Sequence, residues 1–316
     1  MAPANNKELY RKLCDEQGSA IPLFQQYWWM EAVCADKEWD VLFATTSDGS
    51  ITAALPYLIG RKAGMRYVVQ PQLTQFCGIW YNRQMMPTDA RHREQFEVAA
   101  AEKIIAQIKQ LHLVYFQQNL APEITNWLPF HWAGFHQTTR YTYRINDIDD
   151  STEVFARFSK NERQRRIEKV LHHCQTVELS PTRFTDFQDR CRQATGQKNL
   201  LSRRLVERVC GAAKERGQSL CIGLSDEKDT LMAALFVPYD DKCAYYLIPA
   251  LAPEHRNNGA METLVWIALQ RLAGITRCFD FEGSMDRGIG QYYRSFGAQQ
   301  VPYHSLSKSI FTCLVR

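Results

Sequence analysis

The residues best suited to chemistry lie in the stretch 256–261, which reads Arg-Asn-Asn-Gly-Ala-Met. A β-rich run, residues 244–248, precedes it, and an apolar-striped segment that predicts a helix, residues 260–272, follows at once. A helix start offers unpaired backbone N–H groups and the positive end of the helix dipole. Gly259 lets an anion approach the backbone, and Arg256 adds a charge-assisted donor. The pattern predicts a cradle for a pyrophosphate; an ordinary loop with a helix-opening glycine is the alternative.

Two carboxylates, Asp280 and Glu282, lie at the end of a predicted strand, residues 278–281. They alternate with Phe279 and Phe281, so both carboxylates are expected on one face. A carboxylate packed against aromatic rings has its pKa raised toward neutrality, which suits a base that accepts a proton from an amine. Glu282 ranks first because it is nearer the end of the strand. A solvated or capping carboxylate is the alternative for each.

Basic residues gather between positions 157 and 216, which hold 15 Lys and Arg against 7 Asp and Glu, in a chain with a net charge of only +4. Arg163, Arg165, Arg166 and Lys169 are candidates to hold a phosphorylated acceptor or the phosphates of tRNA. The alternative is a solvated helix face that carries ion pairs four residues apart.

The elements that must position these residues occur in the same order in both halves of the chain. The first half predicts helices at residues 7–14, 24–35 and 90–110, and strands at residues 40–46, 51–59, 114–117 and 135–145. The second half predicts strands at residues 220–224, 231–237, 244–248, 278–281 and 309–315, with helices at residues 260–272 and 291–296. A polar acidic break follows residue 145, so we expect two α/β domains, residues 1–146 and 147–316.

The stretch around Arg256 resembles the acyl-CoA pyrophosphate loop of the GNAT acyltransferases, Arg/Gln-x-x-Gly-x-Gly/Ala. Arg256 and Gly259 match its first two fixed positions, and Met261 stands where Gly or Ala is expected. Residues 279–284 and 290–298 are similar to the C-terminal signature of the Fem-like branch, with Tyr293 in place of its Lys and Arg294 as the nearest cation.

The Fem-like resemblance also covers the basic stretch 158–167 and the aromatic stretch 24–29, and so extends over nearly the whole chain. It implies an α/β fold with a mixed sheet, built from two tandem GNAT-like domains. The first half lacks an Arg-x-x-Gly-x-Gly motif and is expected to be degenerate, so the donor is expected in the second.

The resemblance further implies an enzyme, an acyltransferase that moves an acyl group from acyl-CoA, such as acetyl-CoA, to an amine without a metal or a covalent enzyme intermediate. The implied donor-binding residues are Leu247, Ile248, Arg256, Asn257, Asn258, Gly259 and Ala260. The implied catalytic residues are Glu282 and Asp280, together with Tyr293, which would protonate the leaving thiolate.

The acceptor is expected to be a small-molecule or peptide amine bound between the domains. Its candidate ligands are Arg163, Arg166, Tyr292, Arg294 and Trp28. The alternative function is a Fem-like transferase that takes an amino acid from aminoacyl-tRNA to a cell-wall precursor peptide. A non-catalytic binding protein on a GNAT scaffold is a further alternative.

Composition narrows the classes of protein. The ten cysteines contain no C-x-x-C pair, which argues against zinc and favours reduced thiols in a cytoplasmic protein. The first residues lack the apolar core of a signal peptide, and the sequence has no run of about 20 apolar residues, so we expect no membrane insertion. Charged residues at 23% and apolar residues at 45% exclude a largely disordered chain.

Overall fold

The computed structural model describes residues 5–196 and 200–310, apart from the side chains of residues 161 and 162. The chain divides into two compact units, Met1–Arg140 with Pro302–Arg316, and Tyr141–Val301. Both divisions fall inside strands, β6 (His136–Asn146) and β13 (Gln299–Ser309). The second half of β13 belongs to the first unit because it pairs with a strand of that unit, whereas the sequence predicts one division, after residue 146. No helix in the described ranges is long and apolar enough to span a membrane.

The first unit contains a mixed sheet in the order β1, β2, β3, β5 and the second half of β13. Its strands are β1 (Glu38–Thr45), β2 (Ile51–Lys62), β3 (Met65–Val69) and β5 (Tyr115–Asn119), and the short β4 (Trp80–Tyr81) pairs with β2. Asp48 and Gly49 lie between two β-rich runs, a pattern that predicts a hairpin, and the turn joins β1 and β2 in antiparallel fashion. The parallel pairing of β3 with β5 makes the sheet mixed.

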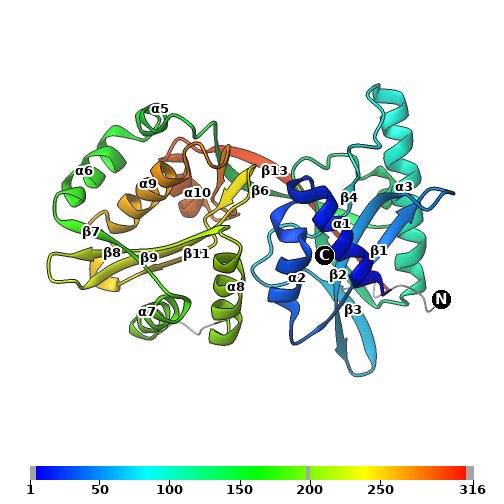
Figure 1. Ribbon diagram of the computed structural model, residues 1–316, viewed down its shortest axis with the longest axis horizontal. Coiled ribbons are helices and arrows are strands. Elements are labelled where there is room, and N and C mark those ends of the chain that lie inside the picture. The colour runs from blue at the N-terminus through cyan, green and yellow to red at the C-terminus, as the bar shows by residue number, and fades with distance from the viewer. Residues whose placement is uncertain (1–4, 197–199, 311–316) are drawn as a thin grey trace. The chain divides into compact units, whose positions relative to one another are not determined.

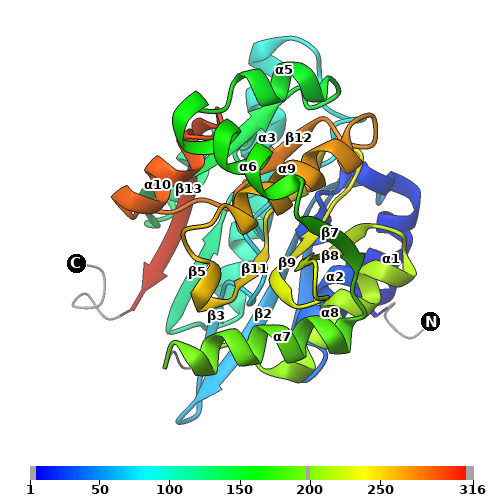
Figure 2. The ribbon, with the colours of Figure 1, turned by 90° about the vertical axis from the view of Figure 1, so that its left-hand side faces the viewer.

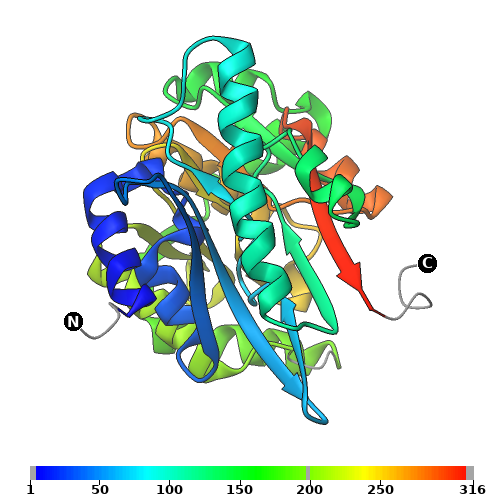
Figure 3. The same cartoon turned by 90° about the vertical axis from the view of Figure 1, so that its right-hand side faces the viewer.

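Helices cover both faces of this sheet. Tyr10 of α1 (Asn6–Gln17) packs against Trp39 and Phe43 on one face, where α2 (Tyr27–Cys34) also lies. The long helix α3 (Ala90–Gln110), cyan in Figure 3, packs Ile104 and Ile105 against the opposite face. The short α4 (Leu128–Trp132) follows β5. The alternation of strand residues between two buried faces explains why β1 and β2 are so rich in apolar residues.

The second unit holds two groups of strands, of which the first is labelled in Figure 1. An antiparallel sheet runs in the order β11 (Ile248–Leu251), β9 (Leu231–Pro238), β8 (Ser219–Asp226) and β7 (Cys174–Glu178). The other group pairs β10 (Cys243–Tyr245) with β12 (Cys278–Asp280) in parallel, and β12 with β6 antiparallel. The single strand expected over residues 244–248 is thus two strands, because the chain changes partner from β12 to β9 after Tyr246.

Helices also cover both faces of the antiparallel sheet, as Figure 2 shows. On one face lie α5 (Ser151–Ala156), the π-helical turn η3 (Lys160–Gln164), α6 (Arg165–Leu171) and α9 (Ala260–Leu272). On the other lie α7 (Pro181–Ala194) and α8 (Arg203–Glu215). A short 3-10 turn, η4 (Pro253–His255), leads into α9, and α10 (Arg287–Arg294) follows β12. The stripe of apolar residues predicted for α9 is buried in the core of the unit.

The strands β3, β7 and β13 were not predicted. The polar sequence of β13 and its Pro302 hid the alternation of its buried residues, Tyr303 and Ser305. The last predicted strand, residues 309–315, lies mostly outside the described residues.

Candidate active site

Glu282 stands immediately after β12, where the chain turns sharply. Its φ is +63°, in the left-handed region, and its N–H donates a 2.7 Å hydrogen bond to Oδ1 of Asp280. The next residue must be glycine, because a Cβ on Gly283 would lie 2.2 Å from the carbonyl oxygen of Tyr141. This turn takes Glu282 out of the strand and is backbone strain of the kind that occurs at functional sites.

The carboxylate of Glu282 is poorly satisfied. Its Oε1 is buried and has no hydrogen-bond partner among the described residues. Burial raises the pKa of Glu282 well above its usual value, and the nearby negative charge of Asp280 raises it further. The side chain therefore has the two properties of a proton acceptor for an amine, an available oxygen and a raised pKa.

Asp280 is fully buried and its two oxygens are occupied. Oδ1 accepts hydrogen bonds from the hydroxyl of Thr142 and from the N–H of Glu282, and Oδ2 accepts a 2.7 Å bond from Nε of Arg144. Both cross-strand partners belong to β6, and no motif in the sequence pointed to them. Asp280 therefore holds the turn at Glu282 and adds negative charge beside it.

Tyr293 of α10 forms the aromatic wall next to Glu282. Its ring stacks on Phe281 with the centroids 4.7 Å apart and the planes at 25°, and it also contacts Tyr143 and Tyr246. Burial, followed by the charges of Glu282 and Asp280, raises the pKa of Tyr293 to about 12. Tyr293 consequently keeps its proton at neutral pH and is a possible acid.

Arg163 and Glu262 form a buried ion pair. We use the name Arg163–Glu262 network for this pair together with Arg166 and Ser295. Nη1 of Arg163 lies 2.8 Å from Oε1 of Glu262, and its Nε donates a 2.6 Å hydrogen bond to Oγ of Ser295. Arg166 approaches the same Glu262 oxygen at 3.6 Å. Arg163 is 6% exposed and Glu262 is 5% exposed. Arg163, predicted to contact substrate, is thus committed to contacts within the unit.

Tyr292 contacts this network through its ring. The guanidinium of Arg163 sits 4.5 Å from the centre of its ring, and a hydrogen bond links the hydroxyls of Tyr292 and Tyr246. Burial raises the pKa of Tyr292, and the charge of Glu262 adds to the rise. The network therefore joins η3 and α9 to the helix that carries both tyrosines.

The predicted donor loop leads into α9. Gly259 has a φ of +92°, and a Cβ there would lie 3.0 Å from Cβ of Arg166 and 3.1 Å from its carbonyl oxygen. Asn258 accepts a 3.0 Å hydrogen bond from the N–H of Ala260. The glycine is required both by its conformation and by the close approach of α6. Met261 is 4% exposed and lies in the core, so its bulk does not crowd the loop.

The remaining donor candidates surround this loop. Arg256, Asn257 and Asn258 are exposed, Leu247 is partly buried and Ile248 is 2% exposed. In the described sheet β11 is an edge strand, paired only with β9, so its other edge presents backbone groups.

A pocket of about 520 Å³ adjoins the donor loop. Its lining comprises Arg166, Lys169 and Val170 of α6, His173 just after it, Asp226 at the end of β8, Glu227 and Lys228 of the β8–β9 turn, Met232, Asn257 and Asn258. It brings together residues predicted separately for the donor (Asn257, Asn258) and for the substrate (Arg166). The spacing of sequence motifs did not indicate His173 or Lys228, because the β8–β9 turn reaches α6 only in the folded unit.

Two other substrate candidates lie elsewhere. Arg294 of α10 is exposed and donates a 3.3 Å hydrogen bond to the hydroxyl of Tyr143. Trp28 belongs to the first unit, is 8% exposed and packs edge-on against Trp29.

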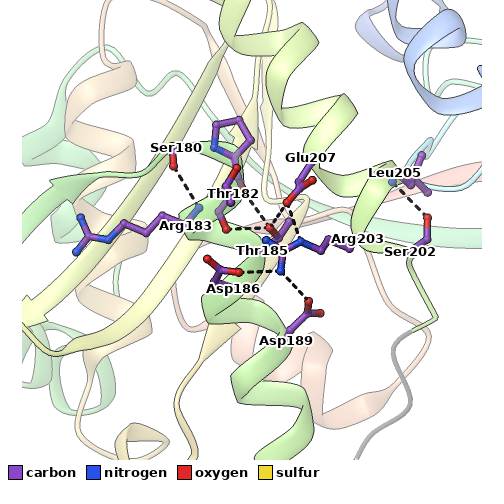
Figure 4. Close-up of polar contacts among 11 residues, drawn as sticks. Ser180, Thr182, Arg183, Thr185, Asp186, Asp189, Ser202, Arg203, Leu205 and Glu207 are labelled. Carbon is purple, nitrogen blue, oxygen red and sulfur yellow. Dashed lines mark hydrogen bonds and ion pairs between the residues drawn. The ribbon is translucent and has the colours of Figure 1, made fainter.

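A polar cluster joins α7 to α8 (Figure 4). Arg203 lies 2.7 Å from Oδ1 of Asp186 and 2.8 Å from Oε1 of Glu207, with Asp189 at 3.8 Å. Thr185 donates a 2.9 Å hydrogen bond to the same oxygen of Glu207. The cluster is half-exposed, so it orients the two helices more than it stabilises them.

Metal ligands do not gather in residues 5–196 and 200–310, where no three His, Cys, Asp or Glu side chains could share an ion. No disulfide joins cysteines within this part of the chain.

Comparisons with known proteins agree with this geometry. Residues 141–293 match the family model of the acetyltransferase (GNAT) domain. The chain matches no curated protein sequence. The fold resembles the crystal structure of FemX, with a TM-score of 0.70 and 9% identity over 92% of this chain and 95% of that chain.

Two further structures share the fold at low sequence identity. A tandem GNAT protein from the clavulanic acid biosynthesis pathway has a TM-score of 0.56 and 11% identity over 96% of this chain and 93% of that chain. The C-terminal domain of a putative lysylphosphatidylglycerol synthetase from Agrobacterium fabrum has a TM-score of 0.57 and 10% identity over 96% and 91%. The expected mixed α/β fold is thereby confirmed. Residues 141–293 thus match a GNAT acetyltransferase domain, and the chain has the tandem GNAT fold that FemX and the clavulanic acid pathway protein share.

Proposed function

We propose that the chain transfers an acyl group from an acyl-CoA donor to an amine acceptor, with Glu282 as the base. The observation that carries this proposal is the buried Oε1 of Glu282, which has no partner among the described residues and lies in a strained turn beside Tyr293. A structural carboxylate in such a place would be expected to have its oxygens satisfied, as those of Asp280 are.

The proposed reaction needs two proton movements. Glu282 takes a proton from the amine as its nitrogen attacks the thioester carbonyl, and the C–S bond then breaks. Tyr293 gives its phenolic proton to the leaving thiolate and recovers one from Glu282 through the surrounding water. The products are an amide and a free thiol, and both side chains return to their starting state.

The donor-loop residues support the choice of acyl-CoA. Gly259 opens α9 with a left-handed φ, and Arg256 and Asn257 are exposed beside it. A pyrophosphate on this loop would meet the positive end of the helix dipole and the Arg256 guanidinium, and it would compete with Asn258 for the N–H of Ala260. The unpaired edge of β11 would offer backbone groups to the pantetheine arm.

Aminoacyl-tRNA is the second candidate donor. The fold shared with FemX and the basic residues of α6 favour it. Against it, Arg163 is buried in an ion pair, which removes one of the cations that were expected to meet phosphates.

Calorimetry of the purified chain with coenzyme A and acetyl-CoA tests the donor. We expect micromolar binding that Arg256→Ala weakens about tenfold, whereas Arg83→Ala, an exposed arginine of the first unit, leaves it unchanged. Undetectable binding of both ligands would refute the acyl-CoA donor, and binding of charged tRNA would then be measured.

Thiol release in the presence of a panel of amines tests the chemistry. Glu282→Gln is expected to lower the rate by roughly 10²–10⁴ while donor affinity stays within a factor of about two, and Tyr293→Phe to lower it less. Full activity of both variants would rule out the proposed roles. Binding without turnover in the native chain would favour a non-catalytic scaffold.

A further inference from the structure

Two side chains of β6 point at a single carboxylate of β12. Arg144 lies directly opposite Asp280 in the antiparallel ladder, and Thr142 lies two residues earlier on the same face of β6. Nε of Arg144 donates a 2.7 Å hydrogen bond to Oδ2 of Asp280, and the hydroxyl of Thr142 donates a hydrogen bond to Oδ1. The reaction proposed above gives neither of these β6 residues a role.

The ion pair of Arg144 with Asp280 is shielded from water. The side chain of Asp280 is fully buried and that of Arg144 is 13% exposed, so dissolved salt screens their attraction only weakly. If the cation were removed, the carboxylate would be left charged and buried, and a carboxylate in that situation takes up a proton. Arg144 therefore keeps Asp280 ionised.

The other titratable groups that face Asp280 are not cations. They are Cys243 and Tyr245 of β10, Glu282 of the turn and Tyr293 of α10. Burial raises the pKa of Cys243, of Tyr245 and of Tyr293, in the last case to about 12, so all three keep their protons at neutral pH. The protonation of Asp280 is consequently decided between Arg144 and Glu282.

The two carboxylates differ in their ability to hold a proton. Both oxygens of Asp280 accept hydrogen bonds, one of them from the N–H of Glu282, whereas Oε1 of Glu282 has no partner among the described residues. Burial raises the pKa of Glu282, and the negative charge of Asp280 raises it further. Surroundings that separate two neighbouring carboxylates in this way make one a fixed charge and the other the group that carries the proton.

We propose that Arg144 is a positioning residue for the proton transfer, because its charge keeps Asp280 ionised and fixed, so that Glu282 carries the exchangeable proton of the pair. This inference rests on the proposed function and deepens it, since it explains why Glu282 rather than Asp280 is the base. Arg144 acts through Asp280, whose Oδ1 accepts the N–H of Glu282 and so holds the left-handed turn. Without Arg144 the two carboxylates would share protons, and the amine would face a base of uncertain charge and position.

Carbon-13 NMR of the carboxyl groups tests the proposal without relying on activity. The full chain is labelled at the side-chain carboxyl carbons of Asp and Glu, and the variants Asp280→Asn and Glu282→Gln assign the two signals. From about pH 5 to about pH 10, we expect the native Glu282 signal to move as the proton leaves and the Asp280 signal to stay at its ionised position. A native Asp280 signal that moves over this range would overturn the inference.

Three variants separate the charge of Arg144 from its other contacts. In Arg144→Gln, which keeps a hydrogen-bond donor and removes the charge, the Asp280 signal should move to the protonated position at neutral pH. In Arg144→Lys, which keeps the charge, and in Thr142→Val, which removes a neutral donor, the signal should stay ionised. Arg271→Met, which breaks an exposed ion pair with Glu178 in the same unit, is the matched control and should leave both signals as in the native protein.

Two results with these variants would overturn the inference. One is an Asp280 signal that stays ionised in folded Arg144→Gln, because the charge of Arg144 would then be unnecessary. The other is an Asp280 signal that becomes protonated in Thr142→Val, because a lost hydrogen bond would then have the effect assigned to the charge. The second result remains decisive if Arg144→Gln does not fold.

Turnover of the same variants separates this inference from the proposed function. With transfer measured as thiol release, Arg144→Gln should lower kcat about tenfold or more while the KM for the donor stays within about twofold, and Arg144→Lys should restore most of the rate. The expected NMR result in a native chain without transfer activity would refute the proposed function and support the assignment of the proton to Glu282. Native kcat in Arg144→Gln, in a chain that is active, would overturn the inference and leave the proposed function intact.

Discussion

Replacement of Arg163 by Met is expected to destabilise the second unit strongly. The substitution keeps the apolar length of the side chain and removes its charge, its 2.8 Å ion pair with Glu262 and its hydrogen bond to Ser295. Among the described residues, Glu262, which is 5% exposed, would then keep the 3.6 Å contact with Arg166, whose side chain is 46% exposed, as its one ion pair. The buried carboxylate of Glu262 would be left without a close cation to offset the cost of its desolvation.

The magnitude follows from the burial of the pair. Breaking a buried ion pair by removing one partner costs about 3–5 kcal/mol, and the bond to Ser295 contributes about 1 kcal/mol within that total. For a unit of this size, 1 kcal/mol lowers the melting temperature by about 2–4 °C, so the expected fall is roughly 6–20 °C. Replacing both partners, as in Arg163→Met/Glu262→Leu, removes the stranded charge and should recover most of the loss.

A double-mutant cycle tests this expectation. Calorimetric melting and urea unfolding are measured for the native chain, for Arg163→Met, for Glu262→Leu and for the double variant. We expect a coupling energy of about 2 kcal/mol or more between the two positions. A loss below about 1 kcal/mol for Arg163→Met, or a double variant as unstable as the sum of the single ones, would refute the reasoning. If Arg163→Met instead kept its melting temperature and weakened substrate binding, Arg163 would be a substrate ligand.

Three further predictions follow from other parts of the second unit. Because the pKa of Glu282 is raised in the folded state, the stability linked to its proton is present below the unfolded value of about 4.3 and is lost as the pH rises through the folded pKa. Urea unfolding at pH 4 and pH 8 should therefore show that the Glu282→Gln variant gains stability over the native chain at the higher pH. Identical dependence of the two proteins' unfolding free energies on pH would contradict this. Gly259→Ala should lower the free energy of unfolding by about 1–3 kcal/mol, because φ is +92° and the new Cβ meets α6. Gly211→Ala, which has open space around it within α8, should raise the free energy of unfolding by about 0.5–1 kcal/mol. Thermal melting of the two variants checks both expectations. Arg203→Ala should lower the melting temperature slightly and more at low salt than at high salt, since its partners are half-exposed; a fall that does not depend on salt would point to lost packing instead.

The sequence by itself determined the local elements and the loop that leads into α9. The Asp-Gly turn predicted the β1–β2 hairpin, and apolar residues at helical spacing predicted α3 and α9 with the bounds that the structure has. Gly259 was singled out as a glycine at a helix start where an anion could approach the backbone, and the structure adds that its φ is +92°. Each of these features depends on residues within a few positions of one another.

Only the tertiary structure decided how the candidate site is satisfied. The sequence ranked Glu282 above Asp280 only because it is nearer the end of the strand. In the structure, Asp280 is occupied by Thr142 and Arg144, which are 138 and 136 residues away, and Glu282 retains an oxygen without a partner among the described residues. The ion pair of Arg163 with Glu262 spans 99 residues, and it turned an expected substrate ligand into a buried contact. Burial and ion pairing depend on which strands and helices meet, and a hydrophobic pattern records only that a face is buried, not which polar group lies opposite.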